Sequence, residues 1–381
     1  MSIKKKILLF ADWYEPGYKA GGPIRSCVNF VGYMSEDFQI HVFTSDRDLN
    51  SRAAYDSVPT DQWLKKESGE YIFYCSPQHL SRNTIREIIH TLQPDYIYLN
   101  SMFSKFFTIY PLLIGLKDPK NVQIILSPRG MLRKSALQFK SFKKKIYLQL
   151  FRQFGLHKKI FFQAADETEQ KDILQYFGSG TRVQLIPNFP SKSSKAILPL
   201  EKSPGNLFVV YVGRIHPIKN LDYLLQVLGK SASNIRLTIV GSIEDPAFWK
   251  QCEQLIANLP RTISVSYMGE MPNDQLPEVL KKNHIFSLPT KGENFGHAIF
   301  EALSFGKPVL ISDQTPWRNL ELAKVGWDLP LEKPEEFAHA IAEASAWSQD
   351  EYNVWSKNAF DFARKSIDVQ HLQQQYRQLF A

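Results

Sequence analysis

The stretch Ile285-Phe-Ser-Leu-Pro-Thr-Lys-Gly-Glu-Asn-Phe-Gly-His-Ala-Ile-Phe-Glu-Ala-Leu303 indicates the fold of this chain. Its first five residues form an apolar run that is typical of a buried strand. A short polar loop follows, and then a helix that we expect to end near Gly306 and Pro308, before a strand at 309–312. In an open parallel sheet such a loop lies at the carboxyl end of a strand, where α/β folds bind ligands.

The loop carries groups suited to an anionic or hydroxylated ligand. The N–H groups of residues 294–296 stand at the start of a helix, which is a natural anion site. Glu293 lies on the loop, and Glu301 is expected about two turns into the helix among apolar neighbours. A carboxylate there costs free energy unless it is hydrogen-bonded, and sugar hydroxyls would supply such bonds. The alternative is that Glu301 faces solvent and Glu293 is an ordinary loop acid.

The length of 381 residues suggests two domains. Both halves alternate strand-like and helix-like runs, which predicts two α/β, Rossmann-like domains with parallel sheets. A segment rich in Ser, Pro and Lys interrupts this alternation and is the best linker. The predicted division is 1–190, linker 191–206, 207–366, and a last helix at 367–381. Residues 45–69 are expected to be irregular.

Positive charge is concentrated in the first half. The net charge is +8, residues 1–190 contain 26 Lys and Arg against 17 Asp and Glu, and ten basic but no acidic residues lie between Arg129 and Ala165. This asymmetry indicates an anionic partner such as phosphate, anionic lipid or nucleic acid.

Apolar residues are interleaved with these basic ones at helical spacing: Phe139, Phe142, Ile146, Leu150 and Phe154. One interpretation is a helix that packs this stripe into the core and exposes a solvated basic face. The other is that residues 129–159 contact an anionic membrane surface near a lipid-phosphate acceptor.

Two further loops carry candidate binding groups. Gly213 permits a tight turn, and Arg214 and Lys219 precede a helix that begins near Asn220, an arrangement that suits a diphosphate. Gly21 and Gly22 follow the first strand and would let the backbone approach a ligand closely. The alternatives are two solvated surface cations and a plain turn.

The Glu-x7-Glu spacing of Glu293 and Glu301, followed by Ala-Leu, resembles the signature of retaining GT-B glycosyltransferases of family 4 (group 1). The resemblance is strong over residues 207–316, weaker over the first domain, and includes enzymes of bacterial surface polysaccharides. It implies two Rossmann-like domains facing a central cleft, with catalytic roles for Glu293, Arg214 and Lys219. It also implies the following donor-binding residues: Gly21, Gly22, Gly213, Glu270, Asn294, Phe295, Gly296, His297 and Glu301.

The first domain departs from this pattern at Ser127-Pro-Arg-Gly-Met131, where many relatives carry a histidine and this chain has Arg129. Arg129 cannot act as a general base, because guanidinium does not deprotonate at working pH, but it could bind phosphate. Glu167 begins a helix that Asp166 or Thr168 could cap. Arg129 and Glu167 are the candidate acceptor contacts.

The resemblance implies a retaining, metal-independent hexosyltransferase. It would use a nucleotide-diphosphate sugar, UDP favoured over GDP, with a lipid-linked glycan of surface polysaccharide as acceptor. No cofactor, metal or nucleic-acid partner is expected. No apolar run reaches the ~20 residues of a membrane span, the first ten residues are interpreted as a strand and not a signal peptide, and the expected location is cytoplasmic, peripheral on the inner membrane. The alternatives are a catalytically silent nucleotide-sugar-binding protein, and a phosphorylase or epimerase on a related fold.

Overall fold

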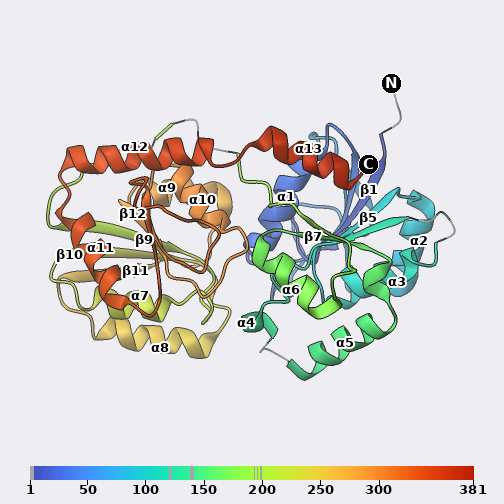
Figure 1. Ribbon diagram of the computed structural model, residues 1–381, viewed down its shortest axis with the longest axis horizontal. Coiled ribbons are helices and arrows are strands. Elements are labelled where there is room, and N and C mark those ends of the chain that lie inside the picture. Colours follow the sequence, from blue (N-terminus) through green and yellow to red (C-terminus); the bar gives the residue numbers. More distant parts are fainter. Residues whose placement is uncertain are drawn as a thin grey trace. The chain divides into compact units, whose positions relative to one another are not determined.

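The computed structural model describes residues 4–118, 120, 122–137, 141–192, 194, 196–197 and 200–381. The chain forms two α/β units (Figure 1). The first contains Met1–Phe189 and Val369–Ala381, and the second contains Pro190–Asp368. The division therefore falls immediately before the expected linker, and the last helix groups with the first unit.

The first unit is built on an eight-stranded sheet in the order β3-β4-β2-β1-β5-β6-β7-β8. All neighbours are parallel except β3, which pairs antiparallel with β4. β3 lies inside residues 45–69, so the expectation of a wholly irregular segment was wrong there. The strands are β1 (Lys6–Phe10), β2 (Gln39–Ser45), β3 (Trp63–Lys65), β4 (Tyr71–Cys75), β5 (Tyr96–Leu99), β6 (Gln123–Leu126), β7 (Phe161–Ala164) and β8 (Val183–Leu185).

Helices and helical turns connect these strands: α1 (Gly22–Met34), α2 (Arg82–Leu92), a π-helical turn (Lys105–Ile109), α3 (Tyr110–Gly115), α4 (Lys134–Leu137), α5 (Ser141–Gln153), a 3-10 turn (Leu156–Lys158), α6 (Glu167–Phe177) and the last helix α13 (Val369–Leu379). α13 is held to this unit by aromatic packing. The Tyr376 ring lies 4.7 Å from that of Phe189 and 5.4 Å from that of Phe30, and the Tyr376 hydroxyl donates to the Pro187 carbonyl oxygen at 3.1 Å.

The second unit has a parallel six-stranded sheet in the order β11-β10-β9-β12-β13-β14. Its strands are β9 (Asn206–Val212), β10 (Asn234–Val240), β11 (Ile263–Tyr267), β12 (Ile285–Leu288), β13 (Val309–Ser312) and β14 (Gly326–Leu329). The predicted strands at 285–288 and 309–312 are confirmed. β14 was not predicted, because Gly326-Trp-Asp-Leu329 lacks an apolar run.

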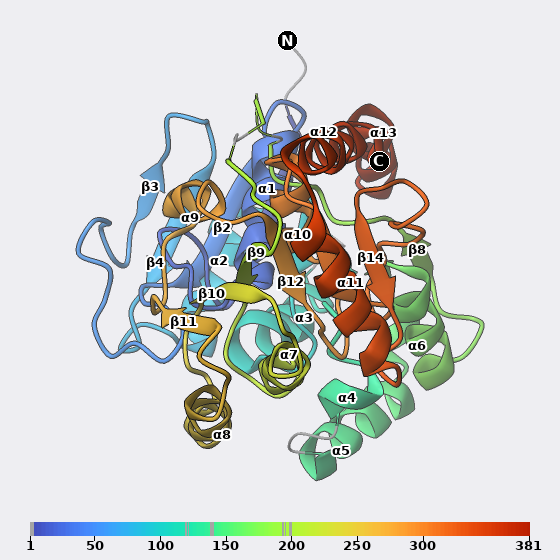
Figure 2. The same ribbon diagram turned by 90° about the vertical axis from the view of Figure 1, so that its left-hand side faces the viewer.

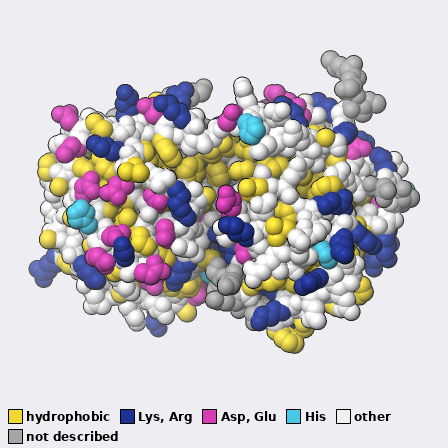
Figure 3. Space-filling model, viewed as in Figure 1, with side chains coloured by type: hydrophobic (Ala, Val, Ile, Leu, Met, Phe, Trp, Pro, Cys, Tyr) yellow, Lys and Arg dark blue, Asp and Glu magenta, His cyan; other side chains and the backbone are white. Residues whose placement is uncertain are grey.

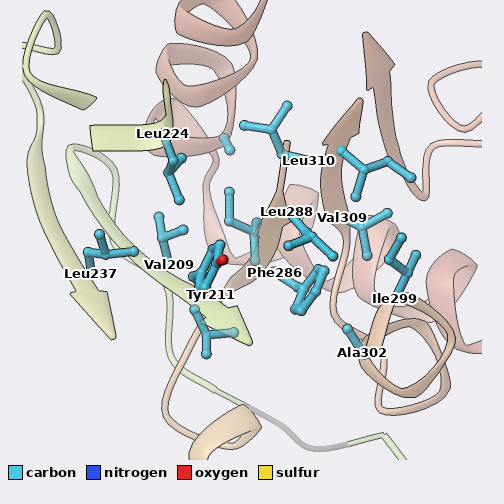
Figure 4. Packing of buried hydrophobic residues seen from close by; sticks show 14 of the residues in the cluster. Val209, Tyr211, Leu224, Leu237, Phe286, Leu288, Ile299, Ala302, Val309 and Leu310 are labelled. Atoms are coloured by element: carbon cyan, nitrogen blue, oxygen red, sulfur yellow. The ribbon is translucent and has the colours of Figure 1, made fainter. Parts of the chain in front are cut away.

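The helical segments of this unit are α7 (Leu221–Leu228), α8 (Pro246–Ala257), a 3-10 turn (Asn273–Gln275), α9 (Leu276–Leu280), α10 (His297–Ser304), α11 (Pro334–Ala346) and α12 (Gln349–Lys365). α9, α10 and α12 lie on one side of the sheet, and α7 and α8 on the other (Figures 1 and 2). Side chains from the strands and from α7 and α10 form the core between these layers (Figure 4).

The end of α10 follows the expected stop signal. Gly306 has a φ of +70°, its N–H donates to the Leu303 carbonyl at 2.9 Å, and the Lys307 N–H donates to the Ala302 carbonyl at 2.9 Å. These two bonds form a Schellman motif, in which glycine takes the left-handed conformation at low cost. α10 is thereby closed before Pro308 redirects the chain into β13.

Candidate functional site

The strand order of the second unit reverses between β9 and β12. Chains leave these adjacent parallel strands toward different neighbours, which opens a crevice at their carboxyl ends, where open α/β sheets bind ligands. The loop after β9 contains Arg214 and Lys219, and the loop after β12 contains Glu293. The topology therefore brings the two predicted motifs of this unit to one position.

Backbone and hydroxyl groups join the two loops. The Lys291 N–H and the Thr290 hydroxyl both donate to the Ile218 carbonyl oxygen, at 2.8 and 3.0 Å. The Glu293 N–H donates to the Gln314 carbonyl oxygen at 3.0 Å, which ties the same loop to the loop after β13. The candidate side chains therefore stand on a hydrogen-bonded framework.

Lys219 and Glu293 form an ion pair across these loops. Their side chains are only 16% and 13% exposed. The N–H of Lys219 donates to the His216 carbonyl oxygen at 2.8 Å, and α7 begins directly afterwards with Asn220 as its N-cap. The expected helix start is confirmed, and the predicted cation lies beside it.

Arg214 also has a carboxylate partner, which the sequence did not reveal. Its guanidinium pairs with Glu244, from the loop between β10 and α8. Ion-pair partners from different loops have no fixed sequence spacing, so neither this pair nor Lys219–Glu293 left a pattern that could be recognised beforehand.

Glu301 is buried on α10 at 7% exposure, so the interpretation of a solvent-facing residue was wrong. It is the fifth residue of the helix and lies little more than one turn from its start, not two turns. The Ser191 hydroxyl donates to Oε1 of Glu301 at 2.8 Å. A residue of the expected linker thus supplies one of the hydrogen bonds that a carboxylate in this apolar helix requires.

The loop before α10 is fixed by a tryptophan that sequence reasoning missed. The Trp317 indole N–H donates to the Phe295 carbonyl oxygen at 2.7 Å, and the two rings lie 5.8 Å apart. Gly296, the N-cap, has a φ of +75°, and His297 begins the helix. Asn294 is partly buried next to them. The predicted N–H groups of residues 294–296 thus lie immediately before the first turn of α10, and their role in anion binding stays a prediction.

Gly213 is not the glycine on which the turn after β9 depends. An added Cβ at Gly213 would meet no atom closer than 3.5 Å, whereas one at Gly241 would lie 1.9 Å from the Gly213 carbonyl oxygen. Gly241 also accepts a hydrogen bond from Tyr267 and donates one to the Gly269 carbonyl. Glu270, the predicted base-proximal residue, follows β11 and is exposed.

In the first unit, the glycine loop lies between β1 and α1. Gly21 has a φ of +64° and open space where a Cβ would stand, and Gly22 is the first residue of α1. Asp48 orders the loop, because its Oδ2 accepts from the N–H groups of Tyr18 and Lys19 at 2.7 and 3.1 Å.

Arg129 is committed to protein contacts. Its guanidinium donates to Asn188, to the Tyr98 hydroxyl at 3.0 Å and to Oδ1 of Asn100 at 2.5 Å. Its φ of +55° is unusual for a residue with a side chain. Any role in phosphate binding stays a prediction, since these groups already use much of the guanidinium.

The acid that reaches the Arg129 loop is Glu169, not Glu167. Glu167 is exposed, while Glu169 is fully buried and accepts from the N–H groups of Gly130 and Ala165 at 2.5 and 2.8 Å. Burial raises the pKa of Glu169, and these hydrogen bonds oppose the rise. Asp166 caps α6 by accepting a hydrogen bond from the Glu169 N–H, so it is Asp166 and not Thr168 that fills the predicted capping role.

A second missed acid stands where the strand order of the first unit reverses, between β1 and β5. Asp12 follows β1, and its Oδ1 accepts from the hydroxyl of Ser104, which follows β5, at 2.7 Å. Burial raises the pKa of this carboxyl. Asp12 stands alone between Ala11 and Trp13, so no spacing identified it.

Helix α5 has two apolar faces. Leu148 and Phe151 point into the core, whereas Phe142, Ile146, Leu150 and Phe154 are 75%, 42%, 43% and 67% exposed. The core-packing interpretation is therefore wrong for these four stripe residues; Phe139 and Lys140 lie outside the described residues. Exposed Lys143, Lys145 and Arg152 flank the stripe. Hydrophobic and basic side chains gather at the lower edge of Figure 3, where α5 lies in Figure 1.

The part of the chain that the structure describes contains no group of three or more His, Cys, Asp or Glu residues that could hold a metal ion. It also contains no helix both long enough and apolar enough to span a membrane.

Residues 195–362 match the family model for glycosyl transferases group 1. A protein of the cps region of Klebsiella pneumoniae, described as uncharacterized, is 25% identical over 65% of this chain and 72% of its own length. The O-antigen chain mannosyltransferase B of Escherichia coli is 32% identical over 28% of this chain and 29% of its own length.

Solved structures extend the likeness to the whole fold. Anabaena Alr3699/HepE, determined in complex with UDP and glucose, has a TM-score of 0.70 and 16% identity, with 99% of each chain covered. At this identity the likeness shows the fold alone, which is GT-B, and the predicted fold class is confirmed. Residues 195–362 are therefore similar to the group 1 glycosyltransferases, and the chain has the GT-B fold.

Proposed function

We propose that this protein is a glycosyltransferase that transfers a hexosyl unit, with retention of anomeric configuration, from a UDP-sugar to a sugar hydroxyl of a lipid-linked glycan in bacterial surface-polysaccharide synthesis. The part of this proposal that concerns the sugar donor rests on one observation: the loops after β9 and β12 meet where the strand order of the second unit reverses. The surface-polysaccharide half is supported by the cps-region and O-antigen relatives. UDP is favoured because HepE was solved with it.

The donor would be held by groups with separate tasks. Glu301 is buried and its side chain accepts a hydrogen bond from Ser191, which suits it to accept further bonds from the ribose hydroxyls. Glu293 would accept from the sugar hydroxyls, while the N–H groups at the start of α10 would face the phosphates. Gly21 and Gly22 would admit the donor close to the backbone of the first unit, and Glu270 would lie near the base.

Arg214 and Lys219 would stabilise the leaving group. In the reaction the bond between C1 and the donor phosphate oxygen breaks, and the acceptor oxygen bonds to C1 on the same face. The acceptor proton passes to a phosphate oxygen, so no side-chain base is required. Negative charge grows on the diphosphate in the transition state, and cations placed there accelerate transfer more than they strengthen binding.

The donor half is tested by thermal unfolding with UDP, GDP, TDP and ADP, on the wild type and on Glu301→Ala. A ligand at ~100 times its dissociation constant adds ~2.7 kcal/mol to the stability of the form it binds. We expect stabilisation of the wild type by UDP and its loss in the variant. If GDP alone stabilised the protein, the proposed donor would be a GDP-sugar instead of a UDP-sugar. If none of the four nucleotides stabilised it, the proposed donor site would be wrong.

The stereochemical half is tested by NMR of the product formed from an α-linked donor. Retention gives an α-glycoside, whereas inversion would contradict the mechanism proposed. The reaction is proposed to be metal-independent, so EDTA should leave the rate unchanged, and a loss restored by Mg²⁺ or Mn²⁺ would refute that part.

The exposed stripe on α5 supports a cytoplasmic enzyme that sits on the inner face of the membrane. Four large apolar side chains in contact with water are costly, and they lie on one helix face beside Lys and Arg. An amphipathic helix with this composition inserts its apolar face at the headgroup boundary while its cations attract anionic lipids. A lipid-linked acceptor would be met on that surface.

Sedimentation with liposomes tests this docking. The wild type should bind vesicles that contain phosphatidylglycerol, and high salt should weaken that binding. Phe142→Ser with Phe154→Ser should abolish it, whereas Leu322→Ser, which removes an 88% exposed side chain from the second unit, should not. Equal binding to neutral and anionic vesicles, or binding to neither, would end the membrane proposal.

A further inference from the structure

Both cations of the proposed diphosphate site are paired with carboxylates. Lys219 pairs with Glu293, and Arg214 pairs with Glu244. The formal charges of these four side chains sum to zero. A diphosphate that enters this site therefore meets cations whose charge is already compensated, and one carboxylate, Glu244, has no role in the donor contacts described above.

The position of Glu244 is fixed by backbone bonds between its loop and that of Arg214. The Ile215 N–H donates to the Ser242 carbonyl at 2.8 Å, and the Glu244 N–H donates to the Ile215 carbonyl at 3.2 Å. An isolated parallel bridge joins Ile215 and Ile243. The two loops also touch at Gly241, which has room for hydrogen alone. Glu244 is therefore held beside Arg214 and does not reach it by chance.

The other titratable groups nearby are otherwise engaged. Asp245, the next residue, caps α8 by accepting from the N–H groups of Ala247 and Phe248, each at 3.0 Å. Burial lowers the pKa of the His216 ring, which disfavours its charged form. Glu244 is the carboxylate that compensates Arg214, and its side chain is 28% exposed beside a guanidinium that is 31% exposed.

We infer that Glu244 is a competing counter-ion, which pairs with Arg214 and gives it up to the donor diphosphate when the donor binds. This inference rests on the proposed function, because it takes Arg214 to be a diphosphate ligand. Glu244 opposes binding of both donor and nucleoside-diphosphate product, and its charge favours release of the product after transfer. At the dielectric constant of a protein surface, a like charge this close to a bound anion measurably weakens the binding of that anion.

Glu244→Gln tests the inference, because the amide keeps the shape and the hydrogen-bonding oxygen and removes only the charge. Isothermal titration calorimetry should show UDP and pyrophosphate bound about three- to thirty-fold more tightly than by the wild type. Uridine, which has no phosphate, should bind equally to both. Glu253→Gln on α8 makes the same change of net charge at an exposed position and should leave UDP affinity unchanged.

The outcomes separate the inference from the function on which it rests. Equal or weaker binding of UDP and pyrophosphate by Glu244→Gln would overturn the counter-ion role and leave the donor site standing. An equal gain in Glu253→Gln would reduce the effect to overall charge and also overturn it. A wild type that binds neither UDP nor pyrophosphate would overturn both. Pyrophosphate keeps the test independent of which base the enzyme prefers.

Discussion

Lys219 and Glu293 form an ion pair that joins the loop after β9 to the loop after β12. Each residue comes from a separate motif, 74 positions apart, and the pair stands where the sheet order reverses. The two side chains are therefore electrostatically coupled. A substitution of one changes the electrostatic surroundings of the other, so single variants in this site cannot be interpreted one residue at a time.

A double-mutant cycle on this pair should show that coupling. Lys219→Met leaves Glu293 mostly buried without a counter-charge, and we expect it to lower the free energy of unfolding by about 1–3 kcal/mol. The double variant with Glu293→Gln should recover most of that loss. Transfer should nevertheless fall about 10²- to 10³-fold in Lys219→Met, as when a donor to a developing anion is removed. Urea unfolding and initial rates measure the two effects, and purely additive losses of stability would contradict the coupling.

Ser191→Ala should weaken the site through Glu301. The serine hydroxyl donates to the carboxylate of Glu301, a residue that is only 7% exposed. A hydrogen bond to a charged group contributes about 1.5–3 kcal/mol to stability. We expect a loss of stability of that size together with weaker UDP binding, both measured by thermal shift. Ser194→Ala is the matched control, because its hydroxyl donates to the nearby Ala196 carbonyl and not to α10. Equal effects of the two substitutions would refute the role of Ser191.

Gly241→Ala and Gly213→Ala should differ sharply, although the sequence pointed to Gly213. A methyl group at Gly241 would lie 1.9 Å from the Gly213 carbonyl oxygen at a φ of +150°, so the two loops must separate. We expect a loss of about 3 kcal/mol or more. At Gly213 the nearest atom would be 3.5 Å away, and the loss should stay below about 1 kcal/mol. Similar melting temperatures for the two variants would show that the loop contact is not required.

The sequence predicted what depends on local pattern. Apolar runs located β12 and β13, the Gly-x-Pro stop located the end of α10, and α7 begins where the sequence predicted it, near Asn220. β3 and β14 escaped prediction because they are short strands at the sheet edges, and neither Trp63–Lys65 nor Gly326–Leu329 contains an apolar run. Their strand geometry comes from neighbours that are distant in the chain.

The same distinction between local pattern and distant contact applies to the residues of the candidate site. Residues that carry a spacing, such as Glu293 and Glu301, were recognised in advance. Residues that act through contact, such as Glu244, Ser191 and Trp317, left no pattern, since their partners lie 22 to 110 positions away. The stripe on α5 shows a further limit: helical periodicity identifies an apolar face but does not reveal whether another element covers it.

Lys307 gives a prediction about pH. It is fully buried behind α10, its Nζ donates to the Tyr352 hydroxyl at 3.2 Å, and burial lowers its pKa to about 8. An unfolded lysine keeps its proton up to a pKa of about 10.4. Between these values the unfolded chain binds a proton that the folded chain has released, so stability contributed by this group rises with pH.

Lys307→Met should remove that slope. Raising the pH from 7.5 to 9.5 should increase the free energy of unfolding of the wild type, relative to that of the variant, by about 2 kcal/mol. One proton contributes about 1.36 kcal/mol for each pH unit above the folded pKa of about 8. Urea unfolding at the two pH values measures this, and the narrow range avoids the ionisation of unfolded tyrosines near pH 10. Lys202, whose pKa burial also lowers to about 8, is present in both proteins and cancels. Parallel pH dependence of the wild type and Lys307→Met would show that Lys307 keeps its proton in the folded state.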